Sequence, residues 1–196
     1  MGPKVGFFGG TFDPFHLGHL NFVIEMLEKS DLDEIWICPT VLSPFKEKEP
    51  PINIKHRMEM IKLAISHMSN LKLIDVEAQN KEVTYTYNTL VELRKNSQNL
   101  TLILSDDLLY SLDKWYQAEE LVQSFPLLVG KRMHIALDEK SVAPFVLNQI
   151  KNKIIPIRLI DVSSSEVRMR LKNKLYCDHL LPLKILDYIH KNKLYS

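Results

Sequence analysis

The sequence has few cysteines, no long apolar run and almost no net charge, and each absence excludes a class of protein. Cys38 and Cys177 lack the paired spacing of a zinc site or a redox dithiol, which predicts free thiols in a reducing compartment. No apolar run approaches the roughly 20 residues that span a bilayer, and residues 5–8 are too short for a signal-peptide core. The formal net charge of +1 argues against nucleic-acid binding. We expect a cytoplasmic protein without membrane or nucleic-acid partners.

Length and composition indicate one globular domain. Of the 196 residues, 45% are hydrophobic and 25% are charged, which is typical of a protein that buries a core. Because the chain shows no linker, repeat or low-complexity segment, we expect a single domain over 1–196. Cys177, Asp178 and His179 are adjacent, and three adjacent side chains do not easily converge on one ion. We therefore expect no metal site built from protein side chains.

Short apolar runs alternate with segments of helical periodicity along the whole chain. The expected strands are 5–8, 34–40, 71–76, 99–104, 125–129 and 154–160. The first expected helix begins after Gly18 and ends near Lys29. The other expected helices cover 54–68, 86–95, 118–123, 142–150, 163–172 and 182–190. This alternation predicts an α/β fold with a mostly parallel sheet, helices on both faces and two closing helices. The proline-rich and charged segment 41–53 is expected to be a surface loop.

The stretch Gly9–His19, with the sequence GGTFDPFHLGH, joins the first strand to the first helix. Parallel sheets place ligand sites at such junctions, because the helix N-terminus presents unpaired N–H groups and the positive end of its dipole. Neither of the two common phosphate motifs, G-x-G-x-x-G and G-x-x-x-x-G-K-[ST], occurs in the chain. Asp13 and Pro14 are expected to shape the turn. A phosphate is the expected ligand.

Two histidines and three glycines carry the chemistry of this stretch. His16 and His19 are three residues apart, so both imidazoles can face the same side of the helix start. Imidazoles can donate to phosphate oxygens and add positive charge when protonated. Gly9, Gly10 and Gly18 have no side chain, which would let a nucleotide lie close to the backbone at these positions. The alternative is that the two histidines only cap the helix.

The stretch Gly9–His19 resembles the signature of the HxGH nucleotidylyltransferase superfamily, and nearly the whole chain is similar to bacterial nicotinate-nucleotide adenylyltransferases. Residues 39–46 resemble the proline-rich loop of that family, which ends in His-Lys, with Phe45 in place of the histidine. Residues 84–90 resemble S-Y-T-x-D-T-L, with Asn88 in place of the aspartate.

Two further motifs extend the resemblance. Residues 105–107 followed by 112–115 resemble G-A-D followed by L-P-x-W, with Ser105 and Asp106 as departures. Residues 162–168, with the sequence VSSSEVR, resemble I-S-S-T-x-I-R.

The resemblance implies a Rossmann-like, doubly wound fold and adenylyl transfer from ATP to nicotinate mononucleotide, with Mg²⁺ on the leaving pyrophosphate. It implies four catalytic residues that supply hydrogen-bond donors or positive charge: His16, His19, Lys46 and Arg168. It implies ATP contacts from Gly9, Gly10, Thr11, Phe12, Gly18, Asp107, Ser164 and Ser165. It implies mononucleotide contacts from Tyr85, Thr86 and Trp115, whose aromatic rings would stack on the nicotinate. Arg132 follows a strand as a family arginine does, but it lies in a different pattern and has no assigned role.

Two alternatives stay open. The same chemistry could act on nicotinamide mononucleotide or another phosphate acceptor, although the motifs around Tyr85 and Trp115 disfavour phosphopantetheine. A nucleotide-binding protein with weakened catalysis is the second alternative, suggested by the departures at Phe45, Asn88, Ser105 and Asp106. The sequence also leaves a homo-oligomer open.

Overall fold

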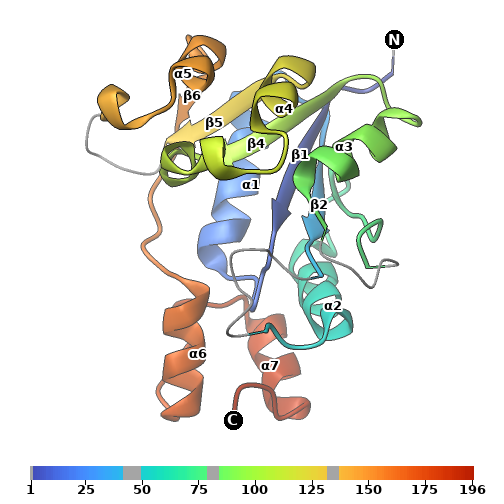
Figure 1. The fold of residues 1–196 in the computed structure, drawn as a ribbon. Coiled ribbons are helices and arrows are strands. Elements are labelled where there is room, and N and C mark those ends of the chain that lie inside the picture. The colour runs from blue at the N-terminus through green and yellow to red at the C-terminus, as the bar shows by residue number, and fades with distance from the viewer. Residues whose placement is uncertain (1, 42–49, 79–83, 132–136) are drawn as a thin grey trace.

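The computed structural model describes residues 2–41, 50–78, 84–131 and 137–196 (Figure 1). Within these residues, six strands form one sheet in the order β3-β2-β1-β4-β5-β6, and every neighbouring pair runs parallel. The strands are β1 (Val5–Gly10), β2 (Glu34–Pro39), β3 (Leu71–Leu73), β4 (Leu100–Ser105), β5 (Leu127–Lys131) and β6 (Ile154–Pro156). The parallel sheet predicted from the sequence is confirmed.

The predicted helices are present between and after the strands. They are α1 (Leu17–Lys29), α2 (Ile54–Ile65), α3 (Thr86–Arg94), α4 (Ala118–Ser124), α5 (Pro144–Ile150), α6 (Ser164–Lys172) and α7 (Leu183–Lys191). Three short 3₁₀ helices were not predicted, because one or two turns carry little apolar periodicity: η1 (Asp106–Tyr110), η2 (Leu112–Lys114) and η3 (Glu139–Ser141). Among the described residues, no helix is both long enough and apolar enough to cross a bilayer.

Some predicted elements are longer than the observed ones. Strand β3 ends at Leu73 instead of residue 76, and β6 ends at Pro156 instead of residue 160. Both strands lie at the edges of the sheet and pair with one neighbour only, so each ends where that single ladder ends. Helix α2 likewise ends at Ile65 and not at residue 68.

Two hydrophobic clusters cover the two faces of the sheet. Neighbouring residues of β1 point to opposite sides, so that Phe8 belongs to one cluster and Phe7 to the other. Buried residues of α1, α2, α6 and α7 join the cluster of Phe8. Those of α3, α4 and α5 join the cluster of Phe7. Helices therefore cover both faces, as the doubly wound fold predicts.

The strand order reverses direction at the centre of the sheet. From β1 the chain runs outward through β2 to β3, and it then returns through α3 to β4 on the other side of β1. In open α/β sheets the crevice outside the carboxyl ends of such strands is the usual ligand site. Gly10 and Ser105 end the two strands at this point, and α6 and α7 lie below the sheet in Figure 1.

Gly130 in β5 offers a test of the packing between the sheet and α1. A Cβ atom at this position would lie 2.5 Å from the Phe22 ring and 3.0 Å from the Met26 sulfur, and both side chains are buried in the core. We predict that Gly130→Ala lowers the free energy of unfolding by about 1–3 kcal/mol through overpacking. Urea denaturation measures this loss. Gly2→Ala is the control, because a Cβ there would meet nothing within 4 Å, and a loss at Gly130 no larger than at Gly2 would contradict the prediction.

Candidate functional site

His16 and His19 form a stacked pair at the start of α1. Their ring centroids are 3.6 Å apart and their planes differ by 18°. His16 is the N-cap residue of α1, and its Nδ1 accepts the backbone N–H of His19 at 3.3 Å. The Nδ1 of His19 in turn accepts the backbone N–H of His16, also at 3.3 Å. The predicted common orientation of the two imidazoles is confirmed.

This reciprocal capping decides which ring nitrogen carries the hydrogen. A ring nitrogen that accepts a backbone N–H is unprotonated, so a neutral imidazole in this arrangement carries its hydrogen on Nε2. In His16 and His19 the N–H donor of a neutral ring therefore lies at Nε2 while the capping bonds are kept. These donors belong to the same helix start as the N-terminal N–H groups of α1, which favour an anion. Helix capping and phosphate binding, which the sequence presents as alternatives, are compatible here.

Aromatic side chains hold the ring of His19. The Phe15 ring stacks on it with centroids 5.3 Å apart, and the Phe12 ring meets it edge to face at 5.0 Å. Phe12 is buried and has a φ of 50°, in the left-handed region that a bulky residue rarely adopts. The side chain of Phe12 therefore supports His19 from the core side, and an ATP contact by Phe12 would involve its backbone.

Two of the predicted ATP-binding glycines are also required by the protein itself. A Cβ at Gly18 would lie 2.9 Å from Cγ1 of Val162 and 3.1 Å from the His16 ring. A Cβ at Gly10 would lie 2.8 Å from the Phe12 ring. The close approach expected for a nucleotide is thus accompanied by a close approach of protein side chains.

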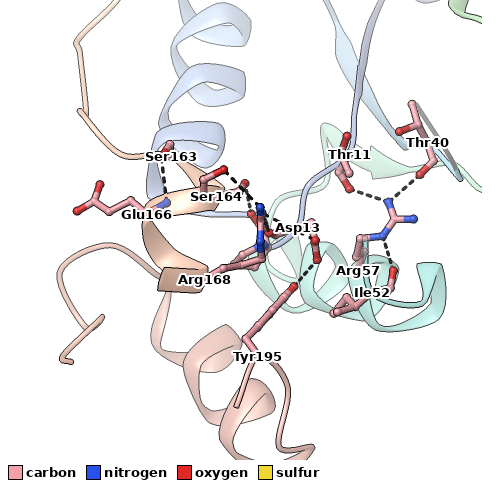
Figure 2. A network of polar contacts seen from close by, with 12 residues as sticks. Thr11, Asp13, Thr40, Ile52, Arg57, Ser163, Ser164, Glu166, Arg168 and Tyr195 are labelled. Atoms are coloured by element: carbon pink, nitrogen blue, oxygen red, sulfur yellow. Dashed lines mark hydrogen bonds and ion pairs between the residues drawn. The ribbon is translucent and has the colours of Figure 1, made fainter. Parts of the chain in front are cut away.

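The start of α6 is docked onto the turn that precedes α1 (Figure 2). Ser163 is the N-cap residue of α6, and its hydroxyl accepts the backbone N–H of Glu166 at 3.1 Å. The hydroxyl of Ser164 donates to the backbone carbonyl of Pro14 at 3.0 Å. The VSSSEVR segment therefore contacts the stretch Gly9–His19 directly.

Arg168 extends the same contact by one turn of α6. Its Nη1 donates to the backbone carbonyl of Asp13 at 2.8 Å, and its Nη2 donates to the hydroxyl of Ser165 at 3.3 Å. The carboxylate oxygen Oδ2 of Asp13 lies 3.9 Å from Nη1. The guanidinium remains partly exposed, with 29% of the side chain accessible, so it can still reach a ligand.

A buried arginine, Arg57 of α2, was missed by the sequence analysis. Its guanidinium donates to four backbone carbonyls at 2.7 to 3.2 Å, those of Thr11, Thr40, Val41 and Ile52. Burial lowers the pKa of Arg57, and the nearby charge of Asp13 opposes that shift. Arg57 thus connects the loop after β1 with the segment after β2.

The position of Arg57 in the helix could have indicated its burial, although a pattern of apolar residues alone does not include it. The buried face of α2 contains Arg57, Met60, Ile61 and Ala64, which recur at helical spacing. Met58, an apolar residue of the same helix, is only partly buried. A charged residue in register with a buried face indicates a charge that needs internal partners.

The carboxylate of Asp13 receives a hydrogen bond from Tyr195, after α7. The phenol oxygen lies 2.6 Å from Oδ1 of Asp13. Burial, with the hydrogen bond to Asp13 as the second cause, raises the pKa of Tyr195. From the sequence, Asp13 was expected only to shape the turn.

The predicted mononucleotide contacts lie at the start of α3 and after η2. Tyr85 is the N-cap residue of α3 but supplies no side-chain cap, which leaves the first N–H groups around Thr86 without that partner. The Tyr85 ring lies 4.6 Å from the ring of Tyr116, which the sequence analysis did not single out. Trp115, beside it in the chain, is half-buried against the second hydrophobic cluster.

Glu77 is hydrogen-bonded to the segment around the start of α3. It is buried, and its carboxylate accepts from the hydroxyl of Thr89 at 2.7 Å and from the hydroxyl of Thr84. Burial raises the pKa of Glu77, and the two hydroxyl donors partly counteract the shift. The chain before Tyr85 is thereby attached to a buried acid.

Comparison with known proteins decides the family. A model of the cytidylyltransferase-like family matches residues 7–170. The nicotinate-nucleotide adenylyltransferase of Bacillus subtilis is 36% identical over 195 residues, covering 98% of each chain. The chain belongs to the nicotinate-nucleotide adenylyltransferases. A probable nicotinate-nucleotide adenylyltransferase of Hydrogenobaculum sp. is also 36% identical over 193 residues, again covering 98% of each chain.

Solved structures agree with the nicotinate-nucleotide adenylyltransferase fold. The Plasmodium falciparum nicotinic acid mononucleotide adenylyltransferase complexed with NaAD has a TM-score of 0.79 at 24% identity, over 99% of this chain and 98% of that chain. The same enzyme complexed with APC has a TM-score of 0.78 at 24% identity and the same coverage. This likeness supports the Rossmann-like arrangement of the sheet and helices.

Of the other residues that match the adenylyltransferase motifs or depart from them, some lie within the described residues and some lie outside them. Lys46, Phe45 and Arg132 lie outside the described residues. At the end of β4, Asp107 is exposed, as a ligand to ribose hydroxyls would need, whereas the departure Asp106 is buried. Asn88 is exposed on α3, and Ser105 is buried.

Two further features of the chain are its cysteines and its possible metal ligands. Cys38 and Cys177 are buried free thiols, as predicted, and burial raises the pKa of each. No group of three or more His, Cys, Asp or Glu side chains able to hold a metal ion occurs in the part of the chain that the structure describes.

Glu77 gives this adenylyltransferase a pH-dependent stability. Because folding raises the pKa of Glu77 above its usual 4.5, its contribution is largest below that value and is lost as pH rises through the raised pKa. Glu77→Gln cannot ionise, and its amide can still accept from one threonine and donate to the other. We predict that the free energy of unfolding of Glu77→Gln improves relative to that of the unsubstituted protein as pH rises above about 4.5.

Urea denaturation at several pH values measures this difference. Glu28→Gln, at an exposed position of α1, is the control. A difference between Glu77→Gln and the unsubstituted protein that stays constant with pH would show that Glu77 keeps its charge at no cost.

Proposed function

We propose that this chain transfers the adenylyl group of ATP to nicotinate mononucleotide, which yields nicotinate adenine dinucleotide and pyrophosphate for NAD biosynthesis. The observation that carries the proposal is the stacked pair of His16 and His19 at the carboxyl end of β1, in a chain 36% identical to nicotinate-nucleotide adenylyltransferase of Bacillus subtilis. The pair presents two Nε2–H donors beside a helix N-terminus, at the crevice where β1 and β4 meet.

The reaction needs positioning and charge neutralisation more than proton transfer. A phosphate oxygen of the mononucleotide attacks the α-phosphorus of ATP in line, a new P–O bond forms, and the bond to the bridging oxygen breaks to release pyrophosphate. The nucleophile is already anionic, so no general base and no covalent intermediate are required. Residues that donate hydrogen bonds to the reacting phosphates lower the barrier.

The ATP half of the site is assigned to the loop after β1 and to the start of α6. His16 and His19 bind the phosphates as donors, and Arg168 faces them from α6. Lys46 is proposed from the sequence alone to complete this set. We expect Mg²⁺ to arrive with ATP, because this ion binds phosphate oxygens and keeps several of its waters.

The mononucleotide half is assigned to the start of α3 and the residues after η2. Tyr85 and Trp115 would contact the nicotinate ring, and N–H groups near Thr86 would hold its carboxylate. Tyr116 lies against Tyr85 and is 46% exposed, so it is a further aromatic surface in this half. The single domain 1–196, the cytoplasmic location and a homo-oligomer remain predictions.

Turnover with defined substrates tests the function. The protein is incubated with MgATP and either nicotinate or nicotinamide mononucleotide, and the dinucleotide is identified by mass while released pyrophosphate is measured. We expect nicotinate adenine dinucleotide as the main product. The nicotinamide product in excess would indicate the amide acceptor. ATP binding in calorimetry without pyrophosphate release from either acceptor would support a nucleotide-binding protein with weakened catalysis.

His19→Ala tests the role of the histidine pair. We predict a loss of about 100-fold or more in kcat, because one positioned donor to a developing charge is removed. Steady-state rates at saturating substrates measure the loss, and thermal unfolding checks that the variant is folded. His190→Ala, at an exposed position of α7, is the control. Near-normal turnover by folded His19→Ala would show that the pair is not catalytic.

A further inference from the structure

The hydrogen bond between Tyr195 and Asp13 joins residues 182 positions apart and lies next to Arg168 (Figure 2). We propose that Tyr195 is a positioning residue: its hydroxyl satisfies one oxygen of the Asp13 carboxylate and so keeps Arg168 available for the polyphosphate. The identity of that ligand rests on the proposed function. The contact itself comes from the structure.

The geometry around Asp13 shows an incomplete ion pair. Oδ1 accepts from the phenol of Tyr195 at 2.6 Å, whereas Oδ2 is 3.9 Å from Nη1 of Arg168. A charge-assisted hydrogen bond between a guanidinium and a carboxylate is about 2.7–2.9 Å long. Arg168 instead donates at 2.8 Å to the backbone carbonyl of Asp13, so its charge is held near the carboxylate without being bound to it.

Loss of the phenol would change this balance. Asp13 is buried, and a buried carboxylate that loses a donor needs another one. All three guanidinium nitrogens of Arg57 already donate hydrogen bonds to backbone carbonyls. Arg168 is the adjacent, partly exposed cation, so it is expected to close onto Asp13 and to withdraw from the crevice.

The hydroxyl of Tyr195 keeps its proton in this environment. Burial and the neighbouring carboxylate raise its pKa, while the charges of Arg168 and Arg57 act in the opposite direction. Tyr195 therefore remains a donor to Asp13 over the working pH range. The contact is a fixed support for Arg168.

The backbone after α7 turns so that the side chain of Tyr195 reaches Asp13. Lys193 and Tyr195 have φ values of 52° and 60°, in the left-handed region. The N–H of Leu194 donates to the carbonyl of Ile189 at 3.1 Å, which turns the chain at the end of the helix. Leu194 and Tyr195 then pack against the hydrophobic cluster that α1, α2 and α7 share.

Tyr195→Phe and Tyr188→Phe form a matched pair of variants. Tyr188 lies on α7, and its hydroxyl is 2.9 Å from Nδ1 of His56 on α2. Each variant removes one phenol hydrogen bond between the closing segment and the rest of the chain, but only Tyr195 contacts Asp13. A general loosening of the fold would affect both.

The experiment measures kcat and KM for MgATP at saturating nicotinate mononucleotide, with thermal unfolding of every variant. We expect Tyr195→Phe to lower kcat/KM by about tenfold, and Tyr188→Phe to leave it unchanged. Wild-type activity in Tyr195→Phe, or equal losses in both variants, would overturn the proposal.

A double-mutant cycle with Arg168→Ala separates positioning from structure. If Tyr195 acts through Arg168, adding Tyr195→Phe to Arg168→Ala changes kcat/KM by less than about twofold. The same loss in both backgrounds would overturn the proposal. Asp13→Asn provides a second background, in which the carboxamide no longer attracts Arg168 and the effect of Tyr195→Phe should also vanish.

Calorimetry with MgATP keeps this test independent of turnover. If the unsubstituted protein releases no pyrophosphate with any mononucleotide, the proposed function fails while the positioning role is still tested. Tyr195→Phe should then weaken MgATP binding in the wild-type background and not in the Arg168→Ala background. Equal affinities of wild type and Tyr195→Phe would overturn the positioning role.

Discussion

The buried guanidinium of Arg57 holds together the two segments that leave the centre of the sheet. It donates at 2.7 Å to the carbonyl of Thr11, after β1, and at 2.7 Å to the carbonyl of Thr40, after β2. A buried cation is tolerated only when its donors are satisfied, so these carbonyls cannot move without exposing an unpaired charge. The conformation of the loop that leads to His16 and His19 depends on this constraint.

One buried acid supports each half of the candidate site. Asp13 lies in the loop that carries the histidine pair, between the phenol of Tyr195 and the guanidinium of Arg168. Glu77 accepts from Thr84 and Thr89 on either side of the start of α3. In both places a buried carboxylate fixes a segment that carries candidate site residues. Such groups need little reorganisation when an anionic substrate arrives.

Much of the fold and part of the site follow from local sequence patterns. Apolar periodicity placed α1, α3 and α7 within one or two residues of their observed bounds. The spacing of His16 and His19 predicted their common orientation, because residues three apart share a helix face. Arg57 escaped prediction, since its acceptor Thr11 is 46 residues away in the chain. Tyr116 escaped prediction because its ring packs against Tyr85, which is distant from it in the chain.

The sequence by itself determined the α/β alternation, the strand-to-helix junction at Gly9–His19 and the family, because helix and strand periods and contiguous motifs are local properties of the chain. Only the tertiary structure decided that Tyr195 would meet Asp13, that α6 would dock on Pro14, and that Glu77 would anchor Thr84. The physical reason is that a buried charge selects its partners by distance in space. That distance is set once the sheet order and the packing of the helices have brought remote segments together.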